Sequence, residues 1–374
     1  MKKYFLIILL IFGFANLSAQ KVGDKQSVQD LIKKGIEHHD AREYKQAIEA
    51  YNAALKIDPN SMMATYELAL SYLELRDYKN AAAYSTKVIN SEDKELLIRA
   101  YGVKSESLAE TGKVDEAIEL LEKALRKLGN DYYLHFNLAL NYFKEGNLDK
   151  TILHVDNALS LEKSQSGAYL LSAYALSDKQ IWVQSILAFQ IFLLMEPDSQ
   201  RSKNAFEEML QVMQVKETTA EPIERSFIQR QLERNTHKND SNSSNIPPPT
   251  DMFQGVDREL IYQAIKNTKD SLSITFSQDS IDVDSINSNL YTTFKEVTRT
   301  IFTVLSEEND ETKTGFIWSF HVPVITAILN SPYFDTYCRY ISVSYFPESL
   351  KWWEDNQESA AKFVRWFEKG DENE

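Results

Sequence analysis

The chain has 374 residues, enough for two or three domains with sizeable cores. Hydrophobic residues make up 43% and charged residues 26% of the chain, which are globular proportions. The formal net charge of −14 argues against nucleic acid or an anionic membrane surface as a partner, because like charges repel.

The first twenty residues, MKKYFLIILLIFGFANLSAQ, have the pattern of a secretory signal peptide. Two lysines precede an apolar run from Tyr4 to Ala15, and a small-residue step ends at Ala19. The run is shorter than the roughly 20 residues that a membrane-spanning helix needs, so we expect cleavage after Ala19 and no stable membrane span in the mature chain. Export would place the protein in the periplasm, and loss of two lysines takes its charge from −14 to −16.

A helical pattern then repeats along the chain. The pair Ala47 and Ala54 in EYKQAIEAYNAALKIDPN recurs in register, and its leading member steps by 34, 36, 34 and 34 residues. Each unit has apolar residues at helical spacing in two stretches separated by a turn, and Pro59 ends the second stretch. Such a unit cannot bury its apolar face alone, so neighbouring units must stack.

These units resemble the tetratricopeptide repeat (TPR) family. The matching positions are Gly35, Ala47, Tyr51, Ala54 and Pro59 in the first unit, Leu68, Ala69, Tyr72 and Ala81 in the second, Ala117 and Ala124 in the third, Leu138, Ala139, Tyr142 and Ala158 in the fourth, and Ala173, Phe189 and Pro197 in the fifth. The resemblance implies a mostly all-α fold, a right-handed superhelix of helical hairpins over residues 28–199, made of five repeats.

Two features follow the repeats. Phe192 replaces a small residue, so the last helix pair should be splayed or should pack on something new. The amphipathic stretch 200–217 is expected to cap the stack, because a terminal repeat needs a cover. A charged and Ser/Asn/Pro-rich linker is predicted over residues 218–250.

Residues 251–374 are predicted to form a separate, mainly helical C-terminal domain. Helical patterns cover roughly 284–308, 316–330, 333–344 and 347–369, whereas the alternating LSITF at 272–276 is too short to assign. Four of the five tryptophans lie here: Trp318, Trp352, Trp353 and Trp366. Cys338, the only cysteine, is expected to be buried.

Residues that could carry catalysis do not form a recognisable pattern. The sequence has no Gly-rich phosphate loop, no nucleophile elbow and no metal-protease spacing of its six histidines. His321 on an apolar helix is expected to be a hydrogen-bonded core histidine. The acids Asp279, Asp282 and Asp284 lack the glycine and glutamate of a calcium loop and fit a helix start better. We therefore expect no enzyme activity, no metal and no cofactor.

The resemblance instead implies a protein-binding groove lined by the first helix of each repeat. By register that face presents an apolar set: Tyr66, Leu70, Leu73, Tyr133, Phe136, Leu140, Phe143, Leu170 and Tyr174. Arg99, Glu106 and Glu110 are the polar contribution of the third repeat. The lysine and asparagine of a carboxylate clamp are absent from the positions that would carry them. The groove could hold an external peptide or protein, or the chain's own C-terminal domain.

The function predicted from the sequence is that of an exported, non-catalytic scaffold for an unknown protein or peptide. Two alternatives stay open. One is an envelope carbohydrate-binding protein that uses the C-terminal tryptophans, which would have to be exposed. The other is an enzyme domain at 251–374 that the repeats recruit, which would need a pocket joining acids with His321.

Overall fold

A computed structural model of the chain describes residues 26–91, 93, 95–215, 255–276 and 283–369. Every regular element in these ranges is helical, which confirms the all-α class. None of the helices found there has the length and apolarity needed to cross a membrane. The expected signal peptide, linker and calcium-like acids fall outside the described positions. Two compact units divide the chain, residues 1–141 and 142–374, and each is treated separately below.

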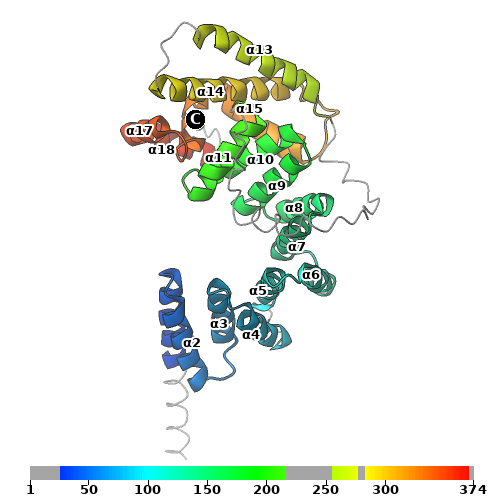
Figure 1. Ribbon diagram of the computed structural model, residues 1–374, viewed down its shortest axis with the longest axis vertical. Helices are drawn as coiled ribbons and strands as arrows, with labels where there is room; N and C mark the ends of the chain where they lie inside the picture. The colour runs from blue at the N-terminus through cyan, green and yellow to red at the C-terminus, as the bar shows by residue number, and fades with distance from the viewer. Residues whose placement is uncertain (1–25, 92, 94, 216–254, 277–282, 370–374) are drawn as a thin grey trace, which may run out of the picture. The chain divides into compact units, whose positions relative to one another are not determined.

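The first unit is a run of helical hairpins (Figure 1). A helix over residues 26–40 is followed by α2 (Tyr44–Ile57), α3 (Met62–Glu74), α4 (Tyr78–Ser91), α5 (Leu97–Glu110) and α6 (Val114–Leu128). The helix α7 (Tyr132–Glu145) contains the boundary between the units. From α2 to α6 each helix packs against the next, which is the arrangement that the repeat register predicts.

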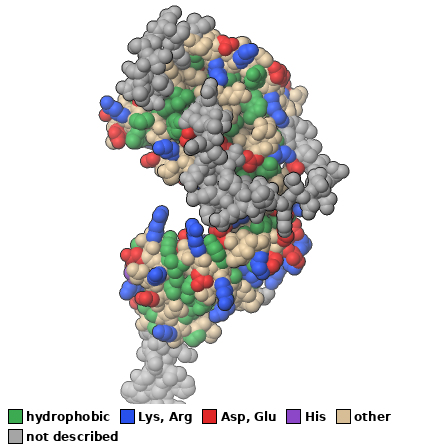
Figure 2. Space-filling model, viewed as in Figure 1, with side chains coloured by type: hydrophobic (Ala, Val, Ile, Leu, Met, Phe, Trp, Pro, Cys, Tyr) green, Lys and Arg blue, Asp and Glu red, His purple; other side chains and the backbone are tan. Residues whose placement is uncertain are grey.

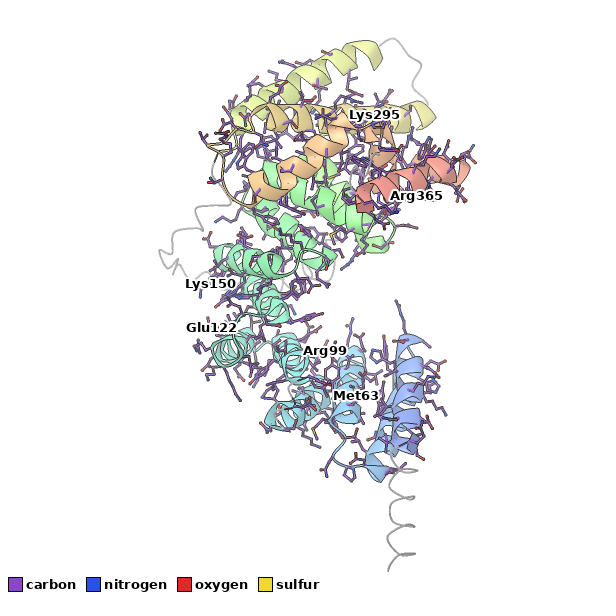
Figure 3. All side chains as sticks on the ribbon, turned by 180° about the vertical axis from the view of Figure 1, so that it is seen from behind. Met63, Arg99, Glu122, Lys150, Lys295 and Arg365 are labelled. Atoms are coloured by element: carbon purple, nitrogen blue, oxygen red, sulfur yellow. The ribbon has the colours of Figure 1, made fainter. Side chains whose placement is uncertain are left out.

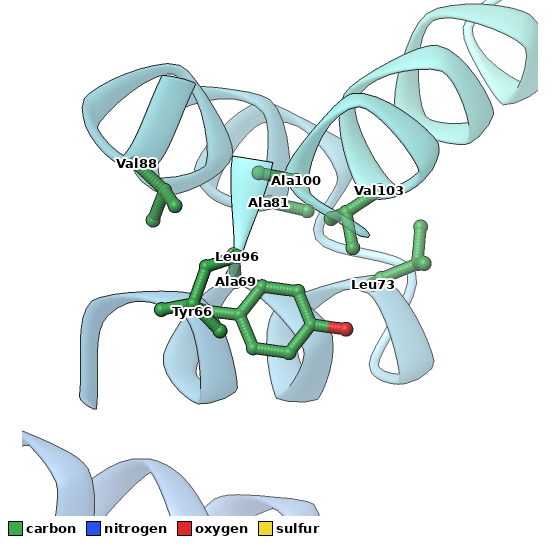
Figure 4. Packing of buried hydrophobic residues seen from close by; sticks show 8 residues of the cluster. All are labelled: Tyr66, Ala69, Leu73, Ala81, Val88, Leu96, Ala100 and Val103. Atoms are coloured by element: carbon green, nitrogen blue, oxygen red, sulfur yellow. The ribbon is translucent and has the colours of Figure 1, made fainter. Parts of the chain in front are cut away.

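Alanines at the predicted register positions lie between the packed helices. Ala47, Ala54, Ala69 and Ala81 have no exposed surface, because the neighbouring helix covers each methyl group. Around Ala69 and Ala81 a cluster from α3, α4 and α5 forms one core, with Val88, Leu96, Ala100 and Val103 (Figure 4). Small side chains at the contact let two backbones approach, and larger ones fill the space beside them.

Gly35 shows how close the first contact is. A Cβ atom at Gly35 would lie 2.3 Å from the Tyr51 ring, and Tyr51 is fully buried. A methyl group cannot fit there unless the ring or the helix moves. Gly35 is therefore a packing requirement of the first hairpin.

The second unit begins with the end of α7 and continues through α8 (Leu148–Leu161), α9 (Ser166–Asp178), α10 (Trp182–Met195) and α11 (Gln200–Val212). After the undescribed stretch come α13 (Arg258–Phe276), α14 (Val283–Glu307), the π-helix η1 (Ile317–His321), α15 (Val322–Asn330), α16 (Phe334–Ile341), α17 (Pro347–Asp355) and α18 (Gln357–Lys369). The unassigned segment 272–276 is the end of helix α13.

The C-terminal helices dock on the last repeat instead of standing apart as a separate domain. Helix α10 packs against α16 and η1, and nearly all of its residues are buried. Tyr337 on α16 donates a hydrogen bond to Gln190 Oε1 on α10, at 3.0 Å. The apolar, non-amphipathic sequence WVQSILAFQIFLLM explains this packing, because a helix that is apolar all round must be covered on every side.

Helix α11 serves the same interface. Phe206 on α11 meets Phe294 on α14 at 4.9 Å between ring centroids, and it also contacts Tyr345 and Phe346. The expected cap therefore joins the repeats to the C-terminal helices. Phe192 does pack on something new, because the Arg201 guanidinium of α11 lies 5.4 Å from its ring centroid.

The tryptophans and Cys338 also have clear positions. Cys338 is fully buried, as expected, and burial raises the pKa of its thiol. Trp318 is buried, and Trp353 and Trp366 pack against Tyr340 and Tyr333. Their rings do not offer the open platform that a carbohydrate-binding role for these tryptophans requires.

The packing around Gly35 predicts a contrast between two glycines in helices. Gly35→Ala should destabilise the first unit by about 1–3 kcal/mol, because the added methyl group overlaps Tyr51. Gly102→Ala is the matched control: its Cβ would meet only the Asn137 amide, at 3.4 Å, and alanine favours a helix by roughly 0.5–1 kcal/mol. Urea denaturation of both variants measures the difference. Equal midpoints would contradict the described approach of the first helix to Tyr51.

Candidate functional site

The predicted groove residues have two fates. In the first unit Tyr66 and Leu73 belong to the buried cluster of Figure 4, and Leu70 packs partly against it. Phe136 and Leu140 are half-buried, and Tyr133 is 45% exposed. In the second unit Phe143, Leu170 and Tyr174 are buried. Most of the apolar set thus contributes to cores, and Tyr133 is the member that offers an open aromatic face.

A polar and aromatic surface in the first unit lies around Arg99. We call it the Arg99 surface and define it by Asp40, Glu67, Arg99, Gly102, Tyr133 and Asn137. Glu67 lies on α3, Arg99 and Gly102 on α5, and Tyr133 and Asn137 on α7, so successive first helices supply them. Figure 3 labels Arg99 and the exposed Met63, and Figure 2 shows hydrophobic side chains at the surface of this unit among charged ones.

Electrostatic interactions show that these residues are neighbours. Burial raises the pKa of Glu67, the Arg99 guanidinium opposes that rise, and Asp40 adds to it. Burial likewise raises the pKa of the Tyr66 hydroxyl, with contributions from Glu67, Arg99 and Tyr133. The first helices of four repeats therefore bring one cation, two acids and two tyrosines within electrostatic range of each other.

Gly102 keeps the centre of this surface low. It has no side chain, and only the Asn137 amide lies within 4 Å of where a Cβ would stand. Asn137 Nδ2 donates to the backbone oxygen of Tyr133, at 2.7 Å, which holds the amide in place. The Asn137 Oδ1 is a hydrogen-bond acceptor at the same place, next to an exposed guanidinium and an exposed phenol ring.

This combination can bind but lacks the parts of a catalytic site. A guanidinium makes paired hydrogen bonds to a carboxylate, an amide pairs with peptide groups, and a tyrosine ring covers apolar surface at low entropic cost. No nucleophile with a base stands among the residues of the Arg99 surface. Across the described ranges, no group of three or more His, Cys, Asp or Glu side chains is placed to hold a metal ion.

The sequence register pointed to part of this surface. Arg99 and Tyr133 are 34 residues apart and occupy equivalent repeat positions, and both were predicted to face the groove. Glu67, Asn137 and Asp40 were missed, because the search followed apolar residues. The available signal was Gly102: a glycine inside a predicted helix indicates either close packing or an open space.

Other sequence candidates lie away from this surface or play structural parts. His38 Nδ1 lies 2.6 Å from the Glu43 carboxylate, and His39 Nδ1 lies 2.8 Å from the Ser71 hydroxyl. The hydroxyl of Tyr78 donates to Glu110 at 3.4 Å. The expectation for His321 is half right: it is a core residue, but neither ring nitrogen has a hydrogen-bond partner among the described atoms.

Comparison with known proteins agrees with the repeat register. The tetratricopeptide repeat family profile matches residues 32–89 and 104–167. A TPR repeat-containing protein of Methanocaldococcus jannaschii is 29% identical over 141 residues, which are 37% of this chain and 24% of that protein. The chain thus matches about a quarter of the length of that curated relative.

Solved structures with similar helical arrays include a thermophilic TPR protein of Thermus thermophilus, at 19% identity and a TM-score of 0.44, covering 50% of this chain and all of that one. Pseudomonas aeruginosa PilF matches at 20% identity and a TM-score of 0.43, over 51% of this chain and 86% of that one.

The pKa shifts in the Arg99 surface lead to a prediction. Arg99→Ala should raise the pKa of Glu67 further, because the guanidinium opposes the effect of burial. A carboxyl carbon NMR titration of the first unit's glutamates within the full chain measures it. Lys123→Ala on α6 is the control, since Lys123 pairs with Glu119 on its own helix. A Glu67 pKa that is unchanged in Arg99→Ala would show that the two groups do not interact.

Proposed function

The chain is a tetratricopeptide-repeat protein, and we propose that it is an exported, non-catalytic scaffold that binds a peptide or protein segment on the Arg99 surface. The observation that carries this proposal is the juxtaposition of exposed Arg99 and Tyr133 with the amide of Asn137. Each supplies a different mode of recognition, and successive repeats present them along one surface.

The chemistry of the surface describes the segment that fits it. Arg99 favours a carboxylate, either a side chain or a chain end, because its planar guanidinium forms two parallel hydrogen bonds. Tyr133 favours an apolar or aromatic side chain, and Asn137 Oδ1 favours a backbone N–H group. Glu67 and Asp40 lie beside the arginine and disfavour a second acid, so a single carboxylate next to an apolar anchor is the expected pattern.

Export is the second part of the proposal, and the sequence alone supports it. Lys2 and Lys3, the apolar run and the Leu17-Ser18-Ala19 step form a signal peptide pattern. Mass spectrometry of the protein purified from its producing cells should find Gln20 at the N-terminus. An intact Met1 form held in membranes would contradict export by cleavage.

Binding on the Arg99 surface predicts a loss on charge reversal. Arg99→Glu together with Tyr133→Ala should weaken capture of the partner at least tenfold, because a paired cation and an aromatic anchor are removed together. Affinity capture with the mature protein, quantified by mass spectrometry, measures the ratio between variant and wild type.

The control for that experiment is Glu119→Lys on α6. Glu119 is exposed and pairs only with Lys123 on the same helix, so its reversal changes the charge by the same amount elsewhere in the unit. Circular dichroism must show that both variants keep wild-type helix content. Equal capture by wild type and the Arg99→Glu, Tyr133→Ala variant would move the binding site off this surface.

A further inference from the structure

A small hollow lies in the second unit where the π-helix η1 meets the fifth repeat. Its walls come from α8, α9, α10 and η1: Leu159, Tyr169, Ser172, Leu176, Gln184, Phe316, Ile317 and His321. Most of this lining is apolar. The space has room for about one water molecule.

Three polar side chains in this lining are almost completely buried. Tyr169 is 0%, Gln184 2% and His321 5% exposed. The Tyr169 hydroxyl, both amide atoms of Gln184 and both ring nitrogens of His321 have no hydrogen-bond partner among the described atoms. A buried polar group without a partner costs roughly 1–3 kcal/mol, so three side chains around one hollow require an explanation.

The chain geometry at His321 is unusual. Residues Ile317–His321 form a π-helix, and the Val322 N–H bonds the carbonyl of Ile317. Pro323 follows and has no N–H to continue an α-helical pattern, which favours the wider turn. The His321 ring lies 6.2 Å from the Tyr169 ring, between centroids, and 5.2 Å from that of Phe316.

We propose that a buried water molecule bridges His321, Gln184 and Tyr169, and that this polar latch holds η1 and α15 on the fifth repeat until His321 is protonated. Water fits because it both donates and accepts, as an amide, an imidazole and a phenol together require. An apolar ligand would leave the same five atoms without partners.

The surroundings of His321 offer nothing that would stabilise a charged ring. From α9 the titratable neighbour is Tyr169, from α10 the neutral Gln184, and from α8 Leu159. Lys163, before α9, lies 5.2 Å from the centroid of Phe320, whose ring is 5.6 Å from that of His321. Burial lowers the pKa of His321 to about 3 from an ordinary value near 6.5. An imidazolium would meet a cation and apolar walls.

The sign of the effect follows from linkage. The docked state binds the proton more weakly than an opened state in which His321 has its ordinary pKa. Docking is therefore unaffected well above pH 6.5 and weakens as pH falls from 6.5 towards 3. Between pH 7 and pH 5 the opening equilibrium should increase roughly 25-fold.

Opening should be local. The Tyr337–Gln190 hydrogen bond and the Phe206 cluster join other parts of the C-terminal helices to the repeats, and neither includes a histidine. These contacts are expected to keep α14 and α16 in place. The proton would then release η1 and α15 without unfolding the second unit.

Hydrogen exchange on the full mature chain tests the latch. After correction for the pH dependence of chemical exchange, amides of residues 317–330 should lose about 25-fold protection between pH 7 and pH 5, and those of α16 should not. His321→Gln, which keeps an amide but cannot be protonated, should remove this pH dependence. His135→Gln is the matched control, because His135 is also buried and its pKa also lowered, but it lies in the first unit.

Each outcome decides the proposal. The same pH response in wild type and His321→Gln, or full protection of wild type at pH 5, would overturn the latch. Should His321→Gln fail to fold, Gln184→Leu serves instead, and it must lower the protection of residues 317–330 already at pH 7. An NMR cross-peak between the Gln184 side-chain amide and a long-lived water is expected, and its absence would overturn the water bridge.

Discussion

The close approach of paired helices at small residues is the constraint on which the rest of this protein depends. Gly35 and the buried alanines Ala47, Ala69 and Ala81 let the helices of the first unit touch, and the Tyr51 ring occupies the space that Gly35 leaves. Because the contacts repeat with the chain register, the first helices of successive repeats supply neighbouring surface positions. The Arg99 surface follows from this, since no single hairpin could bring Glu67, Arg99 and Tyr133 together.

The two units use the same repeat for different ends. In the first unit the repeats leave polar and aromatic side chains open to solvent around Arg99. In the second, α10 has apolar residues on all sides, and the C-terminal helices cover it with Tyr337, η1 and the aromatic cluster at Phe206. A repeat array normally needs a polar cap, and here docked helices replace one. Recognition is thereby assigned to the first unit, and the polar contacts at His321 make part of the docking in the second unit conditional.

The sequence predicted the repeats well because their signal is local and recurrent: alanine spacing, turn residues and helical periodicity agree at each step. It predicted the C-terminal helices by the same periodicity, although the single stretch at 347–369 is two helices, α17 and α18. Side-chain fates were harder. Tyr66 and Leu73 occupy groove positions by register but are buried against Val88, Leu96 and Val103, because Leu96 from the connection before α5 packs on α3. Asn137 and Glu67 were missed since polar residues in helices resemble ordinary solvated surface. The hollow at His321 joins residues more than 130 positions apart, and no local pattern reports such a contact.

The central claim is that partners reach this protein through the Arg99 surface. Site-specific photo-cross-linking in the producing cells tests it most directly, with a photoreactive phenylalanine in place of Tyr133 and, in a second strain, in place of the exposed Lys123 on α6. The account predicts a discrete cross-linked partner from position 133 that is lost when Arg99→Glu is added, and none from position 123. The same partner at equal yield from both positions, or from position 123 alone, would contradict it.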